Sequence, residues 1–232
     1  MNDSLPPPLV RVAAAGDSAL VAEFPGLIDP GINERATALA ASVRSKWSAI
    51  LRDVVVGYCT VTVYFDPLHV DAPWLEAEIR AAAEQTVDVP ARRSMVVDVP
   101  VCYEGDLAPD LEDVASFGNC STADVVALHT ARTYRVYMVG FIPGFAYLAE
   151  VDPRIAAPRR AMPRTAVPAG SVAIAGGQTG IYPAVTPGGW NIIGRTSRKP
   201  YDPLRSEPLL LRAGDEVRFH AVSYQAFEQE SR

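Results

Sequence analysis

The pattern of hydrophobic and polar positions in the first part of the chain predicts short β-strands joined by turns. Residues 10–14 and 19–24 form two such strands around the turn Gly16-Asp17. Two further runs, residues 54–58 and 60–65, are rich in β-branched and aromatic side chains and end at Asp66-Pro67. We therefore expect two pairs of strands in this region.

Helical periodicity is found between the two pairs of strands and again after the second pair. Asp29 is a suitable N-cap and Pro30 suits the first helical position. Apolar residues then recur at helical spacing, namely Ile32, Ala36, Leu39, Ala40, Val43 and Trp47. A second helix is predicted over residues 73–85, with apolar residues on one face. The order ββαββα predicts a small antiparallel sheet that helices cover on one face.

The pattern changes after residues 87–94, which follow neither period and form the predicted linker. Beyond it we expect a strand at 95–101, short helices at 110–115 and 122–130, and a strand at 134–141. Prolines and glycines then separate short β runs at 171–175, 181–182, 190–193, 209–212 and 217–222. Many short strands with turn signals are typical of a barrel or sandwich. The expected fold is α+β, with one domain over residues 1–88 and a second over 89–232.

Composition and charge narrow the class of protein. The 232 residues include 21 Lys and Arg and 27 Asp and Glu, a formal net charge of −6, which argues against nucleic acid or an anionic membrane as a partner. The N-terminal residues lack the features of a signal peptide, and the most apolar stretch, 54–65, is too short to cross a bilayer. We therefore expect a cytoplasmic protein. Cys59, Cys102 and Cys120 have the spacing of neither a disulfide framework nor a zinc motif, so no metal site is predicted.

Charge is distributed unevenly along the chain. Residues 153–201 contain no Asp or Glu but seven cations: Arg154, Arg159, Arg160, Arg164, Arg195, Arg198 and Lys199. Cations grouped without acids favour a carboxylate, phosphate or carbamate ligand, or an acidic partner surface. Arginine adds a planar two-pronged donor that suits carboxylate and phosphate. The alternative is a basic face that pairs with acids elsewhere in the fold.

Three clusters of glycine and proline lie in the same region, at residues 168–171, 176–180 and 186–190. Glycine lets backbone N–H groups approach a ligand, and such groups can hold an anion. The clusters lack the glycine-lysine-serine/threonine ending of a P-loop. Turns of a β-barrel explain the glycines equally well, so both interpretations stay open.

Two further segments have candidate functional residues. Residues 140–148 combine aromatic side chains with glycine and proline, which can build either a pocket wall or a loop that covers the core. His129, at the end of a predicted helix, is the best general-base candidate among His69, His129 and His220. A helix C-terminus also accommodates a histidine for structural reasons alone.

These segments resemble a known family closely. The first signature is Leu128-His129 followed by residues 134–148. The second comprises Pro158-Arg159-Arg160, Pro163-Arg164, residues 167–176 and 178–183, Pro187-Gly188-Gly189-Trp190 and Gly194-Arg195-Thr196. The third comprises Leu211, Gly214-Asp215 and residues 217–219. Together they resemble the family of allophanate hydrolase subunit 1 and the B subunit of 5-oxoprolinase, which also contains a sporulation kinase inhibitor.

The resemblance implies a fold, a reaction and a partner. It implies a small N-terminal α/β sandwich domain followed by a cyclophilin-like β-barrel domain. It implies one component of an ATP-dependent amide or lactam hydrolase, acting on 5-oxoproline, allophanate or a related small anion. The partner would be an allophanate hydrolase subunit 2 or a protein like the C subunit of 5-oxoprolinase, and it would share the ATP site. The alternative is a regulatory protein that inhibits a histidine kinase.

The resemblance and the charge pattern together define the expected site. The expected catalytic residues are His129, Arg159, Arg160 and Arg164. The expected substrate-binding residues are Phe141, Pro143, Gly144, Phe145, Ser171, Gln178, Thr179, Tyr182, Gly188, Gly189, Trp190 and Arg195. We expect the three catalytic arginines to point toward the same region as Gln178, Tyr182 and His129, because fixed positive charge would stabilise a developing oxyanion.

Overall fold

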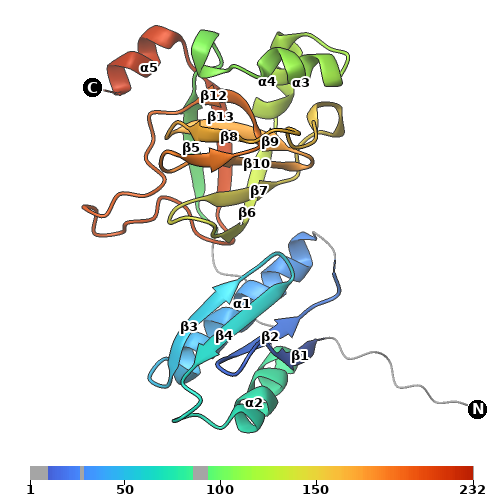
Figure 1. Cartoon of the computed structure of the whole chain (residues 1–232), viewed down its shortest axis with the longest axis vertical. Helices are drawn as coiled ribbons and strands as arrows, with labels where there is room; N and C mark the ends of the chain where they lie inside the picture. The colour runs from blue at the N-terminus through green and yellow to red at the C-terminus, as the bar shows by residue number, and fades with distance from the viewer. Residues whose placement is uncertain (1–9, 27–28, 86–93, 232) are drawn as a thin grey trace, which may run out of the picture. The chain divides into compact units, whose positions relative to one another are not determined.

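The computed structural model describes residues 10–26, 29–85 and 94–231. The chain divides into two compact units, Met1–Arg93 and Ser94–Arg232 (Figure 1). The predicted domain boundary after residue 88, and all of the predicted linker except Ser94, lie outside the described residues.

The first unit contains a four-stranded antiparallel sheet in the order β1-β2-β4-β3. Its strands are β1 (Arg11–Ala14), β2 (Ala19–Glu23), β3 (Leu51–Val56) and β4 (Thr60–Phe65). Alternate residues of β4, including Val61 and Val63, are fully buried, as expected for a sheet with one covered face.

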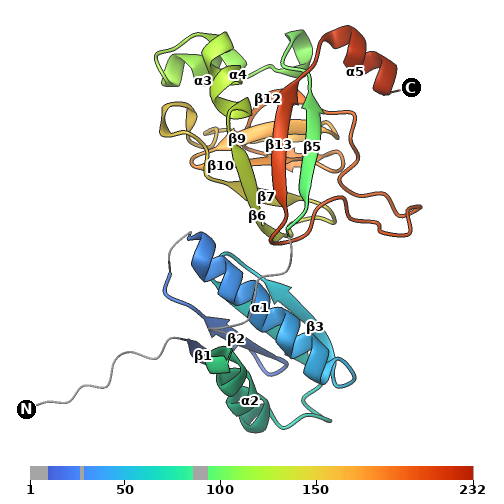
Figure 2. The same ribbon diagram turned by 180° about the vertical axis from the view of Figure 1, so that it is seen from behind.

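Two helices, α1 (Pro30–Trp47) and α2 (Ala72–Gln85), cover that face of the sheet (Figure 2). Asp29 caps α1 as predicted, because its side chain accepts a hydrogen bond from the Ile32 N–H at 2.9 Å. Leu39 and Val43 of α1 pack with Leu75 and Ile79 of α2 in one core cluster. The predicted antiparallel sheet and its covering helices are thus confirmed.

The second unit contains a seven-stranded sheet in the order β12-β9-β10-β7-β6-β13-β5. Its strands are β5 (Val96–Val101), β6 (Thr133–Val139), β7 (Ala146–Ala149), β9 (Ser171–Ala175), β10 (Gln178–Ile181), β12 (Asn191–Arg195) and β13 (Glu216–Ala221). The edge strands β12 and β5 meet where Cys102 and Arg195 exchange two backbone hydrogen bonds of 2.9 Å. This bridge makes the sheet a nearly closed barrel, and the chain as a whole has the expected α+β fold.

The helices of this unit lie outside the barrel sheet. They are α3 (Leu111–Phe117), α4 (Thr122–Thr130) and α5 (Tyr224–Glu230), with 3-10 turns at Gly105–Leu107 and Pro153–Ile155. Helices α3 and α4 lie side by side at one end of the barrel (Figures 1 and 2). No helix in the described part of the chain is long and apolar enough to cross a membrane.

Strand β9 separates two groups of buried side chains. Val172 and Ile174 belong to the large interior cluster of the barrel. Ala173 and Ala175, which alternate with them, belong to a second cluster on the opposite face of the sheet. A two-stranded ribbon of β8 (Arg164–Val167) and β11 (Thr186–Gly188) contributes Val167 to this second cluster.

Several short elements differ from the sequence-based predictions. Strands β7, β8 and β11 and helix α5 were not predicted, and residues 209–212 form no strand apart from a bridge between Tyr201 and Leu209. These strands have three or four residues and lie among prolines and glycines. So short a segment cannot show a clear period, and its pairing depends on distant strands.

Candidate functional site

Aromatic rings from three separate segments meet on the outer face of the barrel. Phe145, just before β7, is the centre of this group. Its ring centroid lies 4.8 Å from that of Tyr147, 5.2 Å from Tyr182 and 5.4 Å from Trp190, all in edge-to-face geometry. We call Phe145, Tyr147, Tyr182 and Trp190 the aromatic cluster.

Two glycines allow these rings to approach the backbone. A Cβ at Gly188 would lie 2.3 Å from the Tyr182 hydroxyl. A Cβ at Gly180 would lie 2.9 Å from the Ala146 carbonyl oxygen and 3.3 Å from the Trp190 ring. A side chain at either position would clash with its neighbours, so the cluster can pack only with glycine there.

Arg159 is the cation of this cluster. Its guanidinium carbon lies 5.9 Å from the centroid of the Trp190 ring, the geometry of a cation–π contact. Within the described residues, Arg159 has no ion pair with a carboxylate. Its exposed guanidinium, packed over the buried Trp190 ring, can therefore accept a carboxylate ligand.

The two tyrosines of the cluster are kept protonated by their surroundings. Burial raises the pKa of Tyr147, and the positive charge of Arg159 offsets only part of this effect. Burial also raises the pKa of Tyr182, against the opposing effects of the Trp190 backbone N–H, Arg159 and Arg164. Near neutral pH both are phenols rather than phenolates, so neither acts as a base.

The other two arginines of the expected catalytic set point elsewhere, which corrects our expectation. Arg160 donates to Asp110 Oδ1 at 2.6 Å, and Arg164 binds the same carboxylate with two hydrogen bonds of 2.7 and 2.9 Å. Asp110 is only 1% exposed. Because its charge is matched by these arginines, Arg160 and Arg164 are parts of a buried ion cluster. The alternative of pairing with acids elsewhere in the fold is correct for these two residues.

His129 is also misplaced for the catalytic role that we expected. It lies inside the barrel with no exposed surface, stacked on Phe219 at a centroid distance of 4.6 Å. Its Nδ1 lies 2.8 Å from the Tyr103 hydroxyl and its Nε2 lies 2.9 Å from Thr179 Oγ1. Burial lowers the pKa of His129 to about 3, so the ring is neutral. With both nitrogens bonded and no access to a ligand, His129 is a structural residue.

The remaining expected substrate-binding residues fall into different environments. Thr179 belongs to the barrel interior through its bond to His129. Ser171 is fully buried in β9, and the backbone of Arg195 forms the barrel seam with Cys102. Thr179 and Ser171 are therefore closed off from solvent, whereas the side chain of Arg195 is half-buried.

The aromatic loop and the glycine-rich turn lie closer to the cluster. Phe141 is 64% exposed and its ring contacts that of Phe145 at 5.9 Å between centroids. Pro143 is exposed in the same loop, and Gly144 adopts a φ of +85° where a Cβ would lie 2.7 Å from Tyr201.

The Gly189 carbonyl accepts a hydrogen bond from the Arg160 N–H at 2.8 Å. Gln178 begins β10, where strand alternation places it on the face opposite Thr179.

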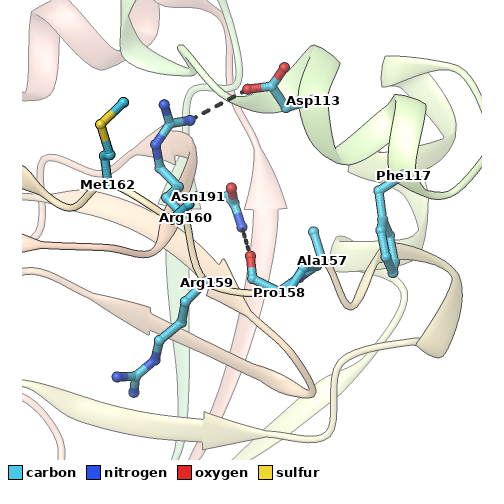
Figure 3. Close-up of a pocket in the computed structure, with 9 residues that line it drawn as sticks. Asp113, Phe117, Ala157, Pro158, Arg159, Arg160, Met162 and Asn191 are labelled. Carbon is cyan, nitrogen blue, oxygen red and sulfur yellow. Dashed lines mark hydrogen bonds and ion pairs between the residues drawn. The ribbon is translucent and has the colours of Figure 1, made fainter.

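An open pocket of about 420 Å³ lies beside Arg159 and Arg160 (Figure 3). Arg160 points toward Asp113 at its rim, whereas the guanidinium of Arg159 points away from Asp113 and Phe117. Asn191 lines the pocket and donates to the Pro158 carbonyl at 2.8 Å. The residues that the structure describes contain no group of His, Cys, Asp and Glu able to hold a metal ion.

Sequence reasoning missed three residues that shape this region: Asp110, Tyr147 and Asn191. Asp110 is the first residue of a predicted helix, and its local sequence gives no sign of its distant partners. Tyr147 lies in the aromatic segment that was singled out, and the density of aromatic residues there was the available signal. We find no sequence signal for Asn191.

Comparison with known proteins identifies the family. The family model described as carboxyltransferase domain, subdomain C and D, matches residues 10–211. The chain is 37% identical to the B subunit of 5-oxoprolinase from Bacillus subtilis (strain 168), over 95% of this chain and 98% of that protein. It is 36% identical to the corresponding 5-oxoprolinase B subunit of Haemophilus influenzae, over 90% of this chain and 97% of that protein.

Solved structures share the fold. Urea carboxylase of Kluyveromyces lactis matches 95% of this chain with a TM-score of 0.80 at 20% identity, and the chain spans 22% of that protein's length. Another solved chain is 40% identical with a TM-score of 0.78, and this chain spans 40% of its length. The chain thus matches nearly the whole length of its two 5-oxoprolinase relatives but only part of these longer solved chains. The protein belongs to the carboxyltransferase-domain family of allophanate hydrolase subunit 1 and the 5-oxoprolinase B subunit.

Proposed function

We propose that this chain is one component of an ATP-dependent 5-oxoprolinase-like hydrolase and acts with a partner that resembles the C subunit of 5-oxoprolinase. The family membership supports this function, because relatives named as the B subunit of 5-oxoprolinase match nearly the whole chain and nearly all of their own length. The reaction opens the lactam of a small carboxylate to give an amino dicarboxylate. Because the reaction consumes ATP, we place the complex in the cytoplasm.

The observation that carries the proposal for this chain is Arg159 above the aromatic cluster. Its guanidinium lies 5.9 Å from the Trp190 ring centroid and, in the described part of the chain, pairs with no carboxylate. A substrate carboxylate would bind the guanidinium with paired hydrogen bonds while the lactam ring packs against Tyr147, the partly exposed ring of the cluster. The Tyr147 hydroxyl, whose pKa is raised by burial, would serve as a hydrogen-bond donor.

The partner is part of the proposal because the aromatic cluster supplies binding groups rather than a base. Arginine and protonated tyrosines hold and orient an anion, but they do not remove a proton near neutral pH. In our proposal the partner completes the site with the group that activates the attacking water. The isolated chain is then expected to be inactive.

Two of the three glycine-rich turns already use a backbone donor within the fold. The Gly170 N–H already donates to the Tyr182 carbonyl and the Gly176 N–H to the Ala157 carbonyl, each at 2.7 Å. Backbone donors that are already bonded cannot hold a phosphate without breaking the turn. In our proposal the nucleotide of the shared site is held chiefly by the partner.

Arg159→Lys in the co-expressed complex tests this proposal. Lysine keeps the charge but loses the paired geometry, so we expect the KM for 5-oxoproline to rise roughly tenfold while kcat changes little. ATP hydrolysis and glutamate formation are measured together. Asp98→Asn is the matched control, because Asp98 forms an exposed ion pair with Arg218 in the same unit.

Two results would contradict the proposal. One is ATP-dependent 5-oxoproline hydrolysis by this purified chain without a partner. The other is a complex in which Arg159→Lys and Asp98→Asn have the same kinetic constants as the unaltered protein.

A further inference from the structure

Asp110 occupies a position at which an aspartate usually caps a helix, yet its side chain makes no capping bond to α3. Its two oxygens accept four hydrogen bonds from other segments instead. Oδ1 accepts from Arg160 at 2.6 Å and from Arg164 at 2.7 Å. Oδ2 accepts from Arg164 at 2.9 Å and from the Ile192 N–H at 2.7 Å. The carboxylate therefore joins α3 to β8, β12 and the segment that contains Arg159.

The residues on both sides of Arg159 are held in place. The Pro158 carbonyl accepts a hydrogen bond from Asn191 at 2.8 Å. The Arg160 N–H donates to the Gly189 carbonyl at 2.8 Å, and the Arg160 side chain is bound to Asp110. Because both neighbours are anchored, the backbone at Arg159 has little freedom.

The side chains of Arg159 and Arg160 point in different directions, as Figure 3 shows. Arg160 turns toward the acidic groups at α3, and Arg159 turns to the Trp190 ring. Without the charge of Asp110, Arg160 would keep only the exposed Asp113 as an ion-pair partner, at 3.4 Å, and its side chain would no longer anchor the segment at α3. The direction of Arg159 is thus coupled to the bond between Arg160 and Asp110.

We propose that Asp110 is a positioning residue that holds Arg159 above the aromatic cluster through Arg160. Asp110 also binds both Arg160 and Arg164, so that Arg159 is the one of the three left to bind the substrate carboxylate. This inference rests on the proposed function, because it takes Arg159 as the group that binds substrate. Asp110 itself, at 1% exposure, touches no substrate.

A double-mutant cycle in the co-expressed complex tests the coupling. Its variants are Asp110→Asn, Arg159→Lys and the double variant, and its readouts are kcat and the KM for 5-oxoproline. Asparagine keeps the shape of the side chain but removes the charge and one acceptor oxygen. We expect each single variant to raise KM roughly tenfold. The KM of the double variant should exceed that of Arg159→Lys by less than about twofold, because both changes act through one contact.

Other outcomes would overturn the proposal. Asp110 has only a general structural role if the KM effects multiply, or if Asp110→Asn lowers kcat without changing KM. A fall in KM would mean that the released Arg160 and Arg164 bind the substrate themselves. If Arg159→Lys alone leaves KM unchanged, the proposed binding role of Arg159 fails as well, which distinguishes the two failures.

A second variant covers the case in which Asp110→Asn does not assemble. Arg160→Lys keeps the positive charge and the backbone bond to Gly189 but shortens the reach to Asp110. The same cycle with Arg159→Lys is then measured, and the KM of the double variant is again expected to exceed that of Arg159→Lys by less than about twofold. Asp98→Asn again serves as the control that leaves both constants unchanged.

Discussion

Inside the barrel, His129 lies among aromatic rings with both ring nitrogens bonded, whereas on the outer face Arg159 lies on an aromatic ring with its charge unpaired within the described residues. Both sites combine a polar group with Phe, Tyr or Trp side chains, so their compositions are similar. They differ in access and in satisfied hydrogen bonds. A polar residue that is buried and fully bonded contributes to stability, whereas an exposed one with an unused donor can bind a ligand.

The ion cluster at Asp110 resembles the histidine site in this respect. Arg160 and Arg164 have the same chemistry as Arg159 and lie close to it in sequence, but they share a buried carboxylate. Burial of that carboxylate without its partners would be costly. Changes at Asp110, His129 and Arg159 test this division between residues that stabilise and a residue that binds, with a decreasing expected effect on the free energy of unfolding.

The largest effect is expected for Asp110→Ala. Removing the buried carboxylate leaves Arg160 and Arg164 without their partner and frees the Ile192 N–H. We expect the free energy of unfolding to fall by about 3–5 kcal/mol. Urea unfolding followed by Trp190 fluorescence, in a chain with Trp47 and Trp74 replaced by Phe, measures this change.

Asp98→Ala provides the comparison for that measurement. Asp98 pairs with Arg218 at 2.7 Å, but both side chains are more than half exposed, at 53% and 57%. We expect its removal to lower the free energy of unfolding far less than Asp110→Ala does, because water screens an exposed ion pair. Equal effects of the two variants would mean that the Asp110 cluster is no more important for stability than a surface pair.

A pH-dependent loss of stability is expected from His129. Its pKa is lowered to about 3 in the folded chain, against an ordinary value of 6.5. The neutral ring is therefore favoured by folding, and its contribution is complete above pH 6.5 and is lost as the pH falls toward 3. Within that range this one group changes the free energy of unfolding by up to about 1.4 kcal/mol per pH unit. The loss of stability at pH 5 is then about 2 kcal/mol.

Unfolding measured from pH 7 to pH 4 tests this expectation. His129→Gln should flatten the pH slope, even though it lowers stability at pH 7 through lost packing. His220→Gln is the control, because His220 is exposed on β13. An unchanged slope in His129→Gln would show that other groups cause the acid sensitivity.

The smallest effect on stability is expected for Arg159→Ala. Its guanidinium is exposed and contacts Trp190 without an ion pair in the described part of the chain. We expect the free energy of unfolding to fall by at most about 0.5–1 kcal/mol. The same urea experiment measures this change. A fall in the free energy of unfolding above about 2 kcal/mol would mean that Arg159 stabilises the fold as Asp110 does, contrary to the proposed division.

Local sequence was sufficient for the elements whose signals lie within a few residues. The Asp29-Pro30 start of α1 and the apolar spacing that follows predicted a helix that the structure places at Pro30–Trp47. Capping and helical periodicity involve neighbours within one or two turns, so a single segment contains the information. The same reasoning predicted the strands of the first unit and the helices that cover them.

The candidate site was predicted in part. The aromatic segment and the arginine-rich segment were singled out from their composition, and Phe145, Tyr182, Trp190 and Arg159 do come together. His129 was assigned to the same site because its chemistry suits a base. Its contact with Thr179, which is 50 positions away, encloses it in the interior instead.

The sequence by itself determined the elements of the first unit, the family, and the arginine-rich and aromatic segments from which a site is built. Tertiary structure alone decided which charges are neutralised and which face each aromatic ring occupies. Asp110 meets Arg160, Arg164 and Ile192 across 50, 54 and 82 positions of chain. Such contacts depend on how strands close into a barrel, because the energy of a charge is set by its burial and its partners rather than by its neighbours in sequence.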